Sequence, residues 1–252
     1  MIKSLKSGGY NSKEEVILIL NEEEFRSYLK QKKKPDNTIS SYIKRVKTFE
    51  SYLNAKNPPK ELDTITREDI EDFAFVWGKE KKIHTYLYLW GVQYYYLFKG
   101  VLNLHKTADE IKEWVQLEKY KLVNFEDINK EYVKMLRSIG IRTAKEMLEQ
   151  GRTPTERTKL ATQSGVPLDY ILELVKLSNL ARIGGLKKKR ARLFYDAGLD
   201  TLDKIANLNV KDLIEKISEF VRKIDFKGRT CSLSEAEHAI SMAKFLNRIV
   251  EY

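Results

Sequence analysis

The chain has 252 residues, 42% of them hydrophobic, and this composition supports a packed core and argues against wholesale disorder. The 46 Lys and Arg residues outnumber the 36 Asp and Glu residues, and the net charge of +10 indicates an anionic partner such as nucleic acid. A single cysteine, Cys231, excludes internal disulfides, and the lack of an 18-residue apolar run or a signal-peptide core predicts a soluble cytoplasmic protein.

Helix-start signals recur along the chain, and the apolar spacing between them is helical. Four segments resemble capping boxes, in which a Ser or Thr side chain caps a helix and an acidic residue follows three positions later. They are Thr66 to Asp69, Thr107 to Glu110, Thr153 to Glu156 and Ser232 to Glu235. Only the run from Val16 to Leu20 has the composition of a short strand. The pattern predicts an all-α fold.

Composition divides the chain into four parts. We expect an arm at 1–20, an aromatic-rich helical domain at 21–106, a connecting helix and linker at 107–130, and a glycine-punctuated helical domain at 131–252.

The last domain contains an internal repeat. The stretch MLRSIGIRTAKEML at 135–148 parallels LFYDAGLDTLDKIA at 193–206. In both copies a glycine is placed to end one helix in the left-handed conformation, and a threonine three residues later is placed to cap the next helix. A duplicated helical unit explains this better than two similar corners that arose by chance.

Charge is unevenly distributed in the first helical domain. Residues 25–60 carry ten Lys or Arg against two acids, whereas residues 61–80 carry seven acids against two bases. A charged run is usually a solvated helix face. Here the reversal favours a cationic helix pair that meets phosphate, next to an acidic third helix that phosphate repels.

The order of elements in this domain strongly resembles the core-binding domain of the tyrosine recombinases, the phage-integrase family. The resemblance spans about residues 22–105 and rests on NTISSY at 37–42, on the helix start ITREDI at 65–70 and on Thr85, which opens the last aromatic helix. It implies a small helical bundle that clamps one side of duplex DNA. The contacts that it implies by position are Thr38, Ser41, Lys44, Arg45, Lys82, His84 and Thr85.

The catalytic residues of that family have no counterpart here. Recombinase chemistry needs a His-x-x-Arg motif and a nucleophilic tyrosine to hold and attack the phosphate. None of the three histidines, His84, His105 and His238, is followed by arginine at that spacing, and they lack the spacing of metal ligands. We therefore expect no catalytic residue, no metal site and no cofactor.

The stretch LARIGGLKKKRARLFYDAG at 180–198 resembles a helix-hairpin-helix motif, in which a glycine turn joins two helices. Its apolar positions match at Ile183, Leu186, Ala191 and Phe194, whereas Lys187 stands where the motif usually has a second glycine. The wider segment, about residues 131–225, resembles an uncharacterised bacterial and archaeal domain family built from such hairpins.

A glycine hairpin can bind phosphate because it lets backbone N–H groups approach an oxygen at a helix N-terminus, where the helix dipole also favours negative charge. The other interpretation is a hairpin that serves only packing or protein interaction. The phosphate-binding residues that we expect here are Arg182, Gly184, Gly185, Lys187, Lys188, Lys189 and Arg190.

These features predict a non-catalytic protein that binds double-stranded DNA, largely through the phosphate backbone, with two helical modules. A role accessory to recombination or repair would give it a recombinase or repair protein as second partner and place it at the nucleoid; no membrane is expected. The alternatives are a helix-hairpin-helix repair enzyme, such as an abasic-site lyase that uses Lys187 to Lys189 with Asp203, and an RNA-binding or protein-interaction module. The sequence leaves the oligomeric state open.

Overall fold

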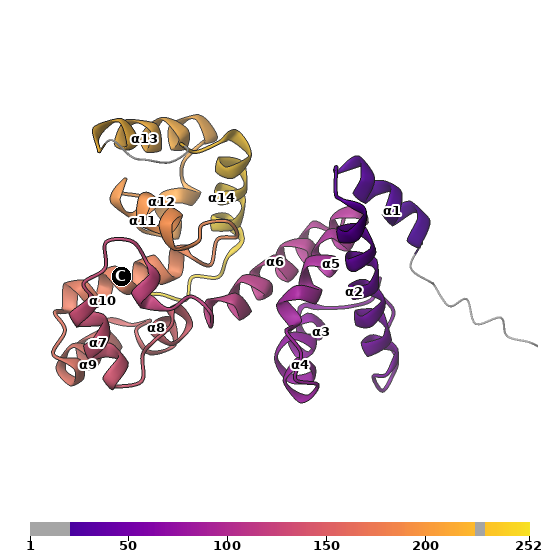
Figure 1. Cartoon of the computed structure of the whole chain (residues 1–252), viewed down its shortest axis with the longest axis horizontal. Helices are drawn as coiled ribbons and strands as arrows, with labels where there is room; N and C mark the ends of the chain where they lie inside the picture. The colour runs from indigo at the N-terminus through magenta and orange to yellow at the C-terminus, as the bar shows by residue number, and fades with distance from the viewer. Residues whose placement is uncertain (1–20, 225–229) are drawn as a thin grey trace, which may run out of the picture.

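The structure, a computed structural model, describes residues 21–224 and 230–252, and its all-α fold confirms the predicted class. In Figure 1 the helices form two groups, α1–α5 and α7–α14, and α6 runs from one to the other. Within the described ranges, extended pairing is limited to an isolated bridge between Lys121 and Thr143. No helix there is long and apolar enough to cross a membrane. The strand expected at Val16 to Leu20 lies outside the described residues.

The first group packs aromatic residues around one core. Its elements are α1 (Glu22–Gln31), α2 (Asp36–Asn54), α3 (Arg67–Glu71), the π-helical η1 (Asp72–Trp77), α4 (Gly78–Glu80) and α5 (Thr85–Phe98). The rings of Phe49 and Phe73 meet edge to face in this core, with centroids 5.0 Å apart. Helices α2 and α5 cross closely because Gly91 has no side chain: a Cβ there would lie 2.7 Å from the carbonyl oxygen of Tyr42.

The second group has its own core, which extends from Leu117 to Val250. It begins with the 3₁₀ turn η2 (Leu122–Asn124), and its helices are α7 (Lys130–Ser138), α8 (Ala144–Gln150), α9 (Pro154–Ser164), α10 (Leu168–Leu180), α11 (Lys188–Asp196), α12 (Leu202–Ala206), α13 (Val210–Lys223) and α14 (Leu233–Phe245).

Helix α6 (Leu102–Leu117) contributes to both cores, with Ile111 in the first and Leu117 in the second. The sequence placed a helix start at Thr107, and this was wrong. The chain leaves α5 through a turn at Gly100, so α6 begins directly after it and Thr107 lies inside the helix. Glu110 is then a buried helix-interior residue instead of a capping acid.

The other predicted helix starts are confirmed. Thr66 and Thr153 each form a complete capping box, and Pro154 occupies the first position of α9. Ser232 caps α14 by accepting a hydrogen bond from the Glu235 N–H at 3.2 Å. Each cap satisfies backbone donors that would otherwise have no partner at the helix start.

The repeated corner also has the predicted geometry. Gly140 (φ +93°) and Gly198 (φ +78°) are both left-handed, and Thr143 and Thr201 cap the helices that follow. Equivalent hydrogen bonds close the two turns, from the Ile141 N–H to the Leu136 carbonyl at 3.0 Å and from the Leu199 N–H to the Phe194 carbonyl at 2.8 Å. This pattern is the Schellman motif, a common way to end a helix.

We predict that Gly140→Ala lowers the free energy of unfolding by about 1 kcal/mol because an L side chain disfavours the left-handed backbone. A Cβ at Gly140 meets no atom within 4 Å, so the cost is conformational. Gly140→Asn should cost less, since asparagine tolerates this conformation. Urea denaturation of both variants and of the equivalent pair at Gly198 checks this; equal losses for Ala and Asn would contradict it.

Candidate nucleic-acid interface

The hairpin between α10 and α11 has the buried apolar positions that the motif requires. Ile183, Leu186, Ala191 and Phe194 are all at most 1% exposed. They hold the two helices together from below the turn, while Gly185 at its tip is exposed and left-handed, with φ +91°. A Cβ on Gly185 would meet nothing within 4 Å, so the backbone here is open to an approaching ligand.

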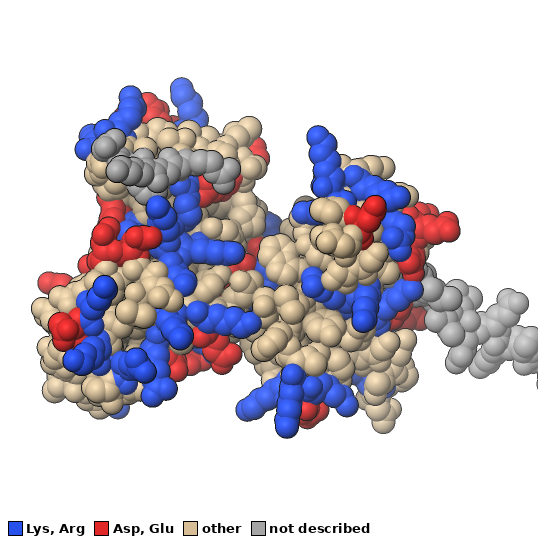
Figure 2. Space-filling view, in the orientation of Figure 1, with Lys and Arg blue, Asp and Glu red and all other residues tan. Residues whose placement is uncertain are grey.

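The N-terminus of α11 follows directly and is strongly basic. Lys187 precedes the helix in ordinary extended conformation (φ −66°, ψ 176°), so the absent second glycine costs no strain. Its side chain makes no capping hydrogen bond, and the first turn contains no acid. Lys187 and Lys189 are exposed and Lys188 is half-buried. Figure 2 shows Lys and Arg side chains gathered over the region of α11 and α12.

Two residues that the sequence assigned to phosphate are buried at the junction between the helix groups. Arg182 is 3% exposed, and its Nη atoms donate to Asn179, to the Asn247 carbonyl and to Glu110. Gly184 packs so closely that a Cβ would lie 2.9 Å from an Asp109 oxygen. Both expectations of a direct phosphate contact are therefore corrected: these residues anchor the hairpin to the rest of the protein.

Arg190 is held by a carboxylate. Its Nε and Nη2 donate to the two oxygens of Glu235 at 2.7 and 2.6 Å, which ties α11 to α14. A bidentate pair of this kind is among the stronger hydrogen-bonded arrangements. A phosphate would have to displace Glu235 from Arg190. The exposed members of the predicted set are Gly185, Lys187 and Lys189, and the half-buried Lys188 lies between the two lysines.

The predicted contacts on α2 converge in a second place. Thr38, Ser41 and Arg45 line a groove of about 400 Å³ between α2 and α5, together with Trp90. Lys44 is exposed on the same helix. The structure thus brings three of the predicted residues together in this groove, two hydroxyls and one cation, while Lys44 lies on the same helix outside the groove lining.

The three residues expected to contact DNA at the start of α5 differ in exposure. Thr85 is 3% exposed, and its hydroxyl donates to the Ala74 carbonyl at 3.0 Å, so its predicted DNA contact is corrected to a structural role. Lys82 and His84 are exposed. His84 lines a cavity of about 440 Å³ whose lysines come from both helix groups. Those lysines are Lys79, Lys119 and Lys145. The sequence missed Lys119 and Lys145 because only the docking of the two groups brings them beside His84.

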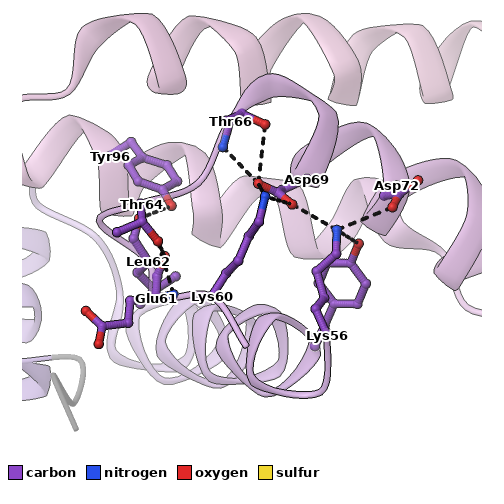
Figure 3. Close-up of polar contacts among 10 residues, drawn as sticks. Lys56, Lys60, Glu61, Leu62, Thr64, Thr66, Asp69, Asp72 and Tyr96 are labelled. Atoms are coloured by element: carbon purple, nitrogen blue, oxygen red, sulfur yellow. Dashed lines mark hydrogen bonds and ion pairs between the residues drawn. The ribbon is translucent and has the colours of Figure 1, made fainter. Parts of the chain in front are cut away.

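The contrast between a basic pair of helices and an acidic third helix is smaller in the folded protein than in the sequence. Figure 3 shows Lys56 and Lys60 bound to Asp69, at 2.8 Å each, and Lys56 also reaches Asp72 at 3.3 Å. Lys47 and Arg26 likewise pair with Glu22. At least four of the ten cations in 25–60 therefore have carboxylate partners within the described residues.

Asp69 illustrates the electrostatics of this network. Its carboxylate is 2% exposed, and burial alone would oppose ionisation. The hydrogen bonds from Lys56, Lys60 and the Thr66 N–H outweigh that effect and lower the pKa of Asp69 to about 2. Asp69 therefore stays charged and fixes the start of α3.

The carboxylate of the alternative lyase interpretation is engaged in an ion pair. Asp203 on α12 pairs with Arg248, with Nη2 to Oδ1 at 2.9 Å. Among the described residues, no three His, Cys, Asp or Glu side chains come together as potential metal ligands.

One further group of residues gave no signal in the sequence: the buried charges of α6. Asp109, Glu110, Lys112 and Glu113 are each at most 7% exposed. Lys112 Nζ contacts Asp109, lies 3.3 Å from Glu113 and stacks 3.6 Å from the Trp90 ring centroid. Burial raises the pKa of Glu113. In the sequence these residues look like an ordinary solvated helix face.

The comparisons with known proteins add one match. A family described as a domain of unknown function (DUF4332) matches residues 126–246, which contain α7 to α14. No curated protein and no solved structure matches the chain. The description of this family assigns no activity.

The shifted pKa of Asp69 predicts a pH-dependent stability. Because the folded pKa, about 2, lies below the unfolded value of 3.8, the stabilisation of about 2 kcal/mol is complete above about pH 5 and declines as the pH falls toward 2. The stability difference between wild type and Asp69→Asn should therefore shrink from pH 6 to pH 3, measured by urea unfolding. Asp36→Asn, on the exposed start of α2, controls for net charge. A difference that is constant with pH would contradict the assignment.

A second prediction concerns Arg182. Arg182→Ala should lower the free energy of unfolding by about 3 kcal/mol, because it leaves the buried Glu110 with one arginine instead of two. Lys187→Ala, at an exposed position, should change it by less than about 0.5 kcal/mol. Chemical unfolding of both variants tests the anchoring role, which an unchanged stability of Arg182→Ala would refute.

Proposed function

We propose that this protein is a non-catalytic binder of double-stranded DNA that contacts the phosphate backbone through two surfaces. The first is the hairpin surface, Gly185 with Lys187 to Lys189. The second is the α2–α5 groove with Thr38, Ser41 and Arg45, together with the exposed Lys44 on the same helix.

The observation that carries the proposal is the combination at the tip of the hairpin. An exposed left-handed glycine, with open space where its side chain would be, leads directly into an uncapped helix N-terminus with three lysines. Backbone N–H groups and the helix dipole favour an anion at such a place, and lysines add attraction that does not depend on base sequence. The net charge of +10 supports the same class of partner.

The α2–α5 groove supports duplex DNA as the form of that partner. Hydroxyl groups and cations along one helix can contact successive phosphates and hold a duplex in register. The resemblance of this part of the chain to recombinase core-binding domains suggests the same use. An accessory role in recombination or repair, with a recombinase or repair protein as partner and location at the nucleoid, is part of this proposal and has the same basis.

The test is replacement of Lys187, Lys188 and Lys189 by Gln. Affinity for a 20-base-pair duplex should fall about tenfold or more at 0.1 M salt, equally for unrelated sequences, because each lost phosphate contact removes nearly one unit from the slope of log affinity against log salt. Fluorescence anisotropy over a salt series measures both quantities. Duplex RNA as competitor determines whether DNA is the preferred nucleic acid.

The matched control is the triple variant of Lys211, Lys216 and Lys223, which are exposed on α13, to Gln. It removes the same charge and should leave the affinity within about twofold of the wild type. Equal losses of affinity in the two triple variants would mean that the hairpin lysines act only through the net charge of the protein, and would contradict a specific role of the hairpin. A hairpin variant that binds duplex DNA as tightly as the wild type would end the proposal.

A further inference from the structure

A cleft of about 310 Å³ lies at the junction of the two helix groups. Arg67 and Phe75 line it from the first group, Trp114 from α6, and Arg152 and Arg182 from the second group. Its volume is at the lower end of the range for small-molecule sites, which favours a ligand the size of a single nucleotide. None of the expected DNA contacts except Arg182 belongs to it.

One wall of the cleft is basic. The guanidinium groups of Arg152 and Arg182 both lie 5.9 Å from the Trp114 ring centroid. Arg152 donates through Nε to the Leu148 carbonyl at 3.2 Å, and no carboxylate in the described part of the chain pairs with it. Burial and the nearby charge of Arg152 both lower the pKa of Arg182, to about 10, while Glu110 opposes them. An anion beside both groups would relieve their mutual repulsion.

The buried arginine is incompletely compensated. Arg182 Nη2 lies 3.3 Å from Glu110, but the other oxygen of Glu110 is engaged by Arg67 at 2.8 Å. Arg182 Nε is buried and has no hydrogen-bond partner among the residues that the structure describes. Three arginines and two glutamates, Glu71 and Glu110, line the cleft and leave one positive charge in excess. Buried charge without a full partner is costly, so the structure favours a bound anion here.

The cleft also has an apolar and aromatic lining. Phe75 is 38% exposed although it is a large hydrophobic residue, and Trp114 and Ile249 are only partly buried. Exposed aromatic rings beside cations suit a ligand with a flat ring and an anionic group, because bases stack on aromatic side chains while phosphate pairs with arginine.

We propose that this cleft binds a nucleoside monophosphate, either free or as the 5′-phosphorylated end of a DNA strand, with its base against Phe75 and Trp114 and its phosphate paired with Arg152, close to the buried positive charge of Arg182. The free-nucleotide form stands without the proposed function, whereas the strand-end form rests on it. In the strand-end form, the terminal nucleotide with its 5′-phosphate enters the cleft, so the protein would bind at the end of a duplex in preference to its middle.

The first experiment titrates the full-length protein with dAMP and, separately, with deoxyadenosine, by isothermal calorimetry. The nucleotide should bind at least about tenfold more tightly than the nucleoside, since charge-assisted hydrogen bonds to arginine contribute about 1.5–3 kcal/mol. Arg152→Gln should weaken dAMP binding about tenfold, and Phe75→Ala should weaken dAMP and deoxyadenosine alike.

Arg222→Gln is the matched control. Arg222 is exposed on α13 and donates through Nε to the Ser218 carbonyl four residues earlier, as Arg152 does to Leu148, so the variant removes the same charge and the same kind of hydrogen bond at another place. Its affinity for dAMP should equal that of the wild type. Equal effects of Arg152→Gln and Arg222→Gln would overturn the assignment to the cleft, and so would equal affinities for dAMP and deoxyadenosine.

The second experiment compares one blunt duplex with 5′-phosphate ends and the same duplex with 5′-hydroxyl ends. The phosphorylated duplex should bind more tightly, and Arg152→Gln should abolish the difference. Binding of dAMP without duplex binding would support the cleft and count against the proposed function. If the protein binds duplex DNA but shows neither a preference for phosphorylated ends nor any binding of dAMP, the assignment of the cleft is overturned and the proposed function stands.

Discussion

The burial of Glu110 is the constraint on which the arrangement of this molecule depends. Its two oxygens lie 2.8 Å from Arg67, in the first helix group, and 3.3 Å from Arg182, in the second. A carboxylate removed from water costs several kcal/mol unless cations and hydrogen bonds replace the water. Helix α6 can therefore bury its charged face only when both groups are in place, and this requirement fixes how the two cores sit relative to each other.

The same face of α6 positions the hairpin. Gly184 lies against Asp109, whose Oδ2 is 3.7 Å from His238 of α14, so the base of the turn is held between α6 and α14. The next residue, Gly185, then projects outward with its backbone open. Adjacent glycines thus do different things: one permits close packing and the other a left-handed exposed turn. The buried half of the hairpin is what makes the exposed half a defined surface.

Local signals in the sequence were sufficient for much of the fold. Helix caps and the repeated glycine corner depend on residues three to five positions apart, so the sequence pattern contains both partners. The apolar hairpin positions were predictable for the same reason. Thr107 shows the limit: the spacing of a capping box also occurs inside a helix, and only the turn at Gly100 reveals where α6 begins.

The exposure of individual site residues could not be predicted in this way. Arg182 and Lys187 are both cations of one basic run, yet Glu110, 72 residues before Arg182, decides that Arg182 is buried. Lys60 and Asp69 looked like members of opposing charge blocks, and folding pairs them. Such pairing depends on tertiary contacts that a charge count does not contain.

The pairing of charges separates two kinds of cation in this protein. With 46 cations and 36 acids, internal ion pairs can neutralise most charges but leave a surplus of ten. A cation that already holds a carboxylate must give it up before it can bind phosphate, whereas an unpaired exposed lysine only releases counterions. Lys44 beside the α2–α5 groove and Lys187 at the hairpin are exposed and unpaired within the described residues, one on each helix group. In the proposed function, the fixed relation of the two groups at the Glu110 junction would hold the second surface at a high effective concentration relative to a duplex bound at the first, so that two weak contacts act as one stronger contact.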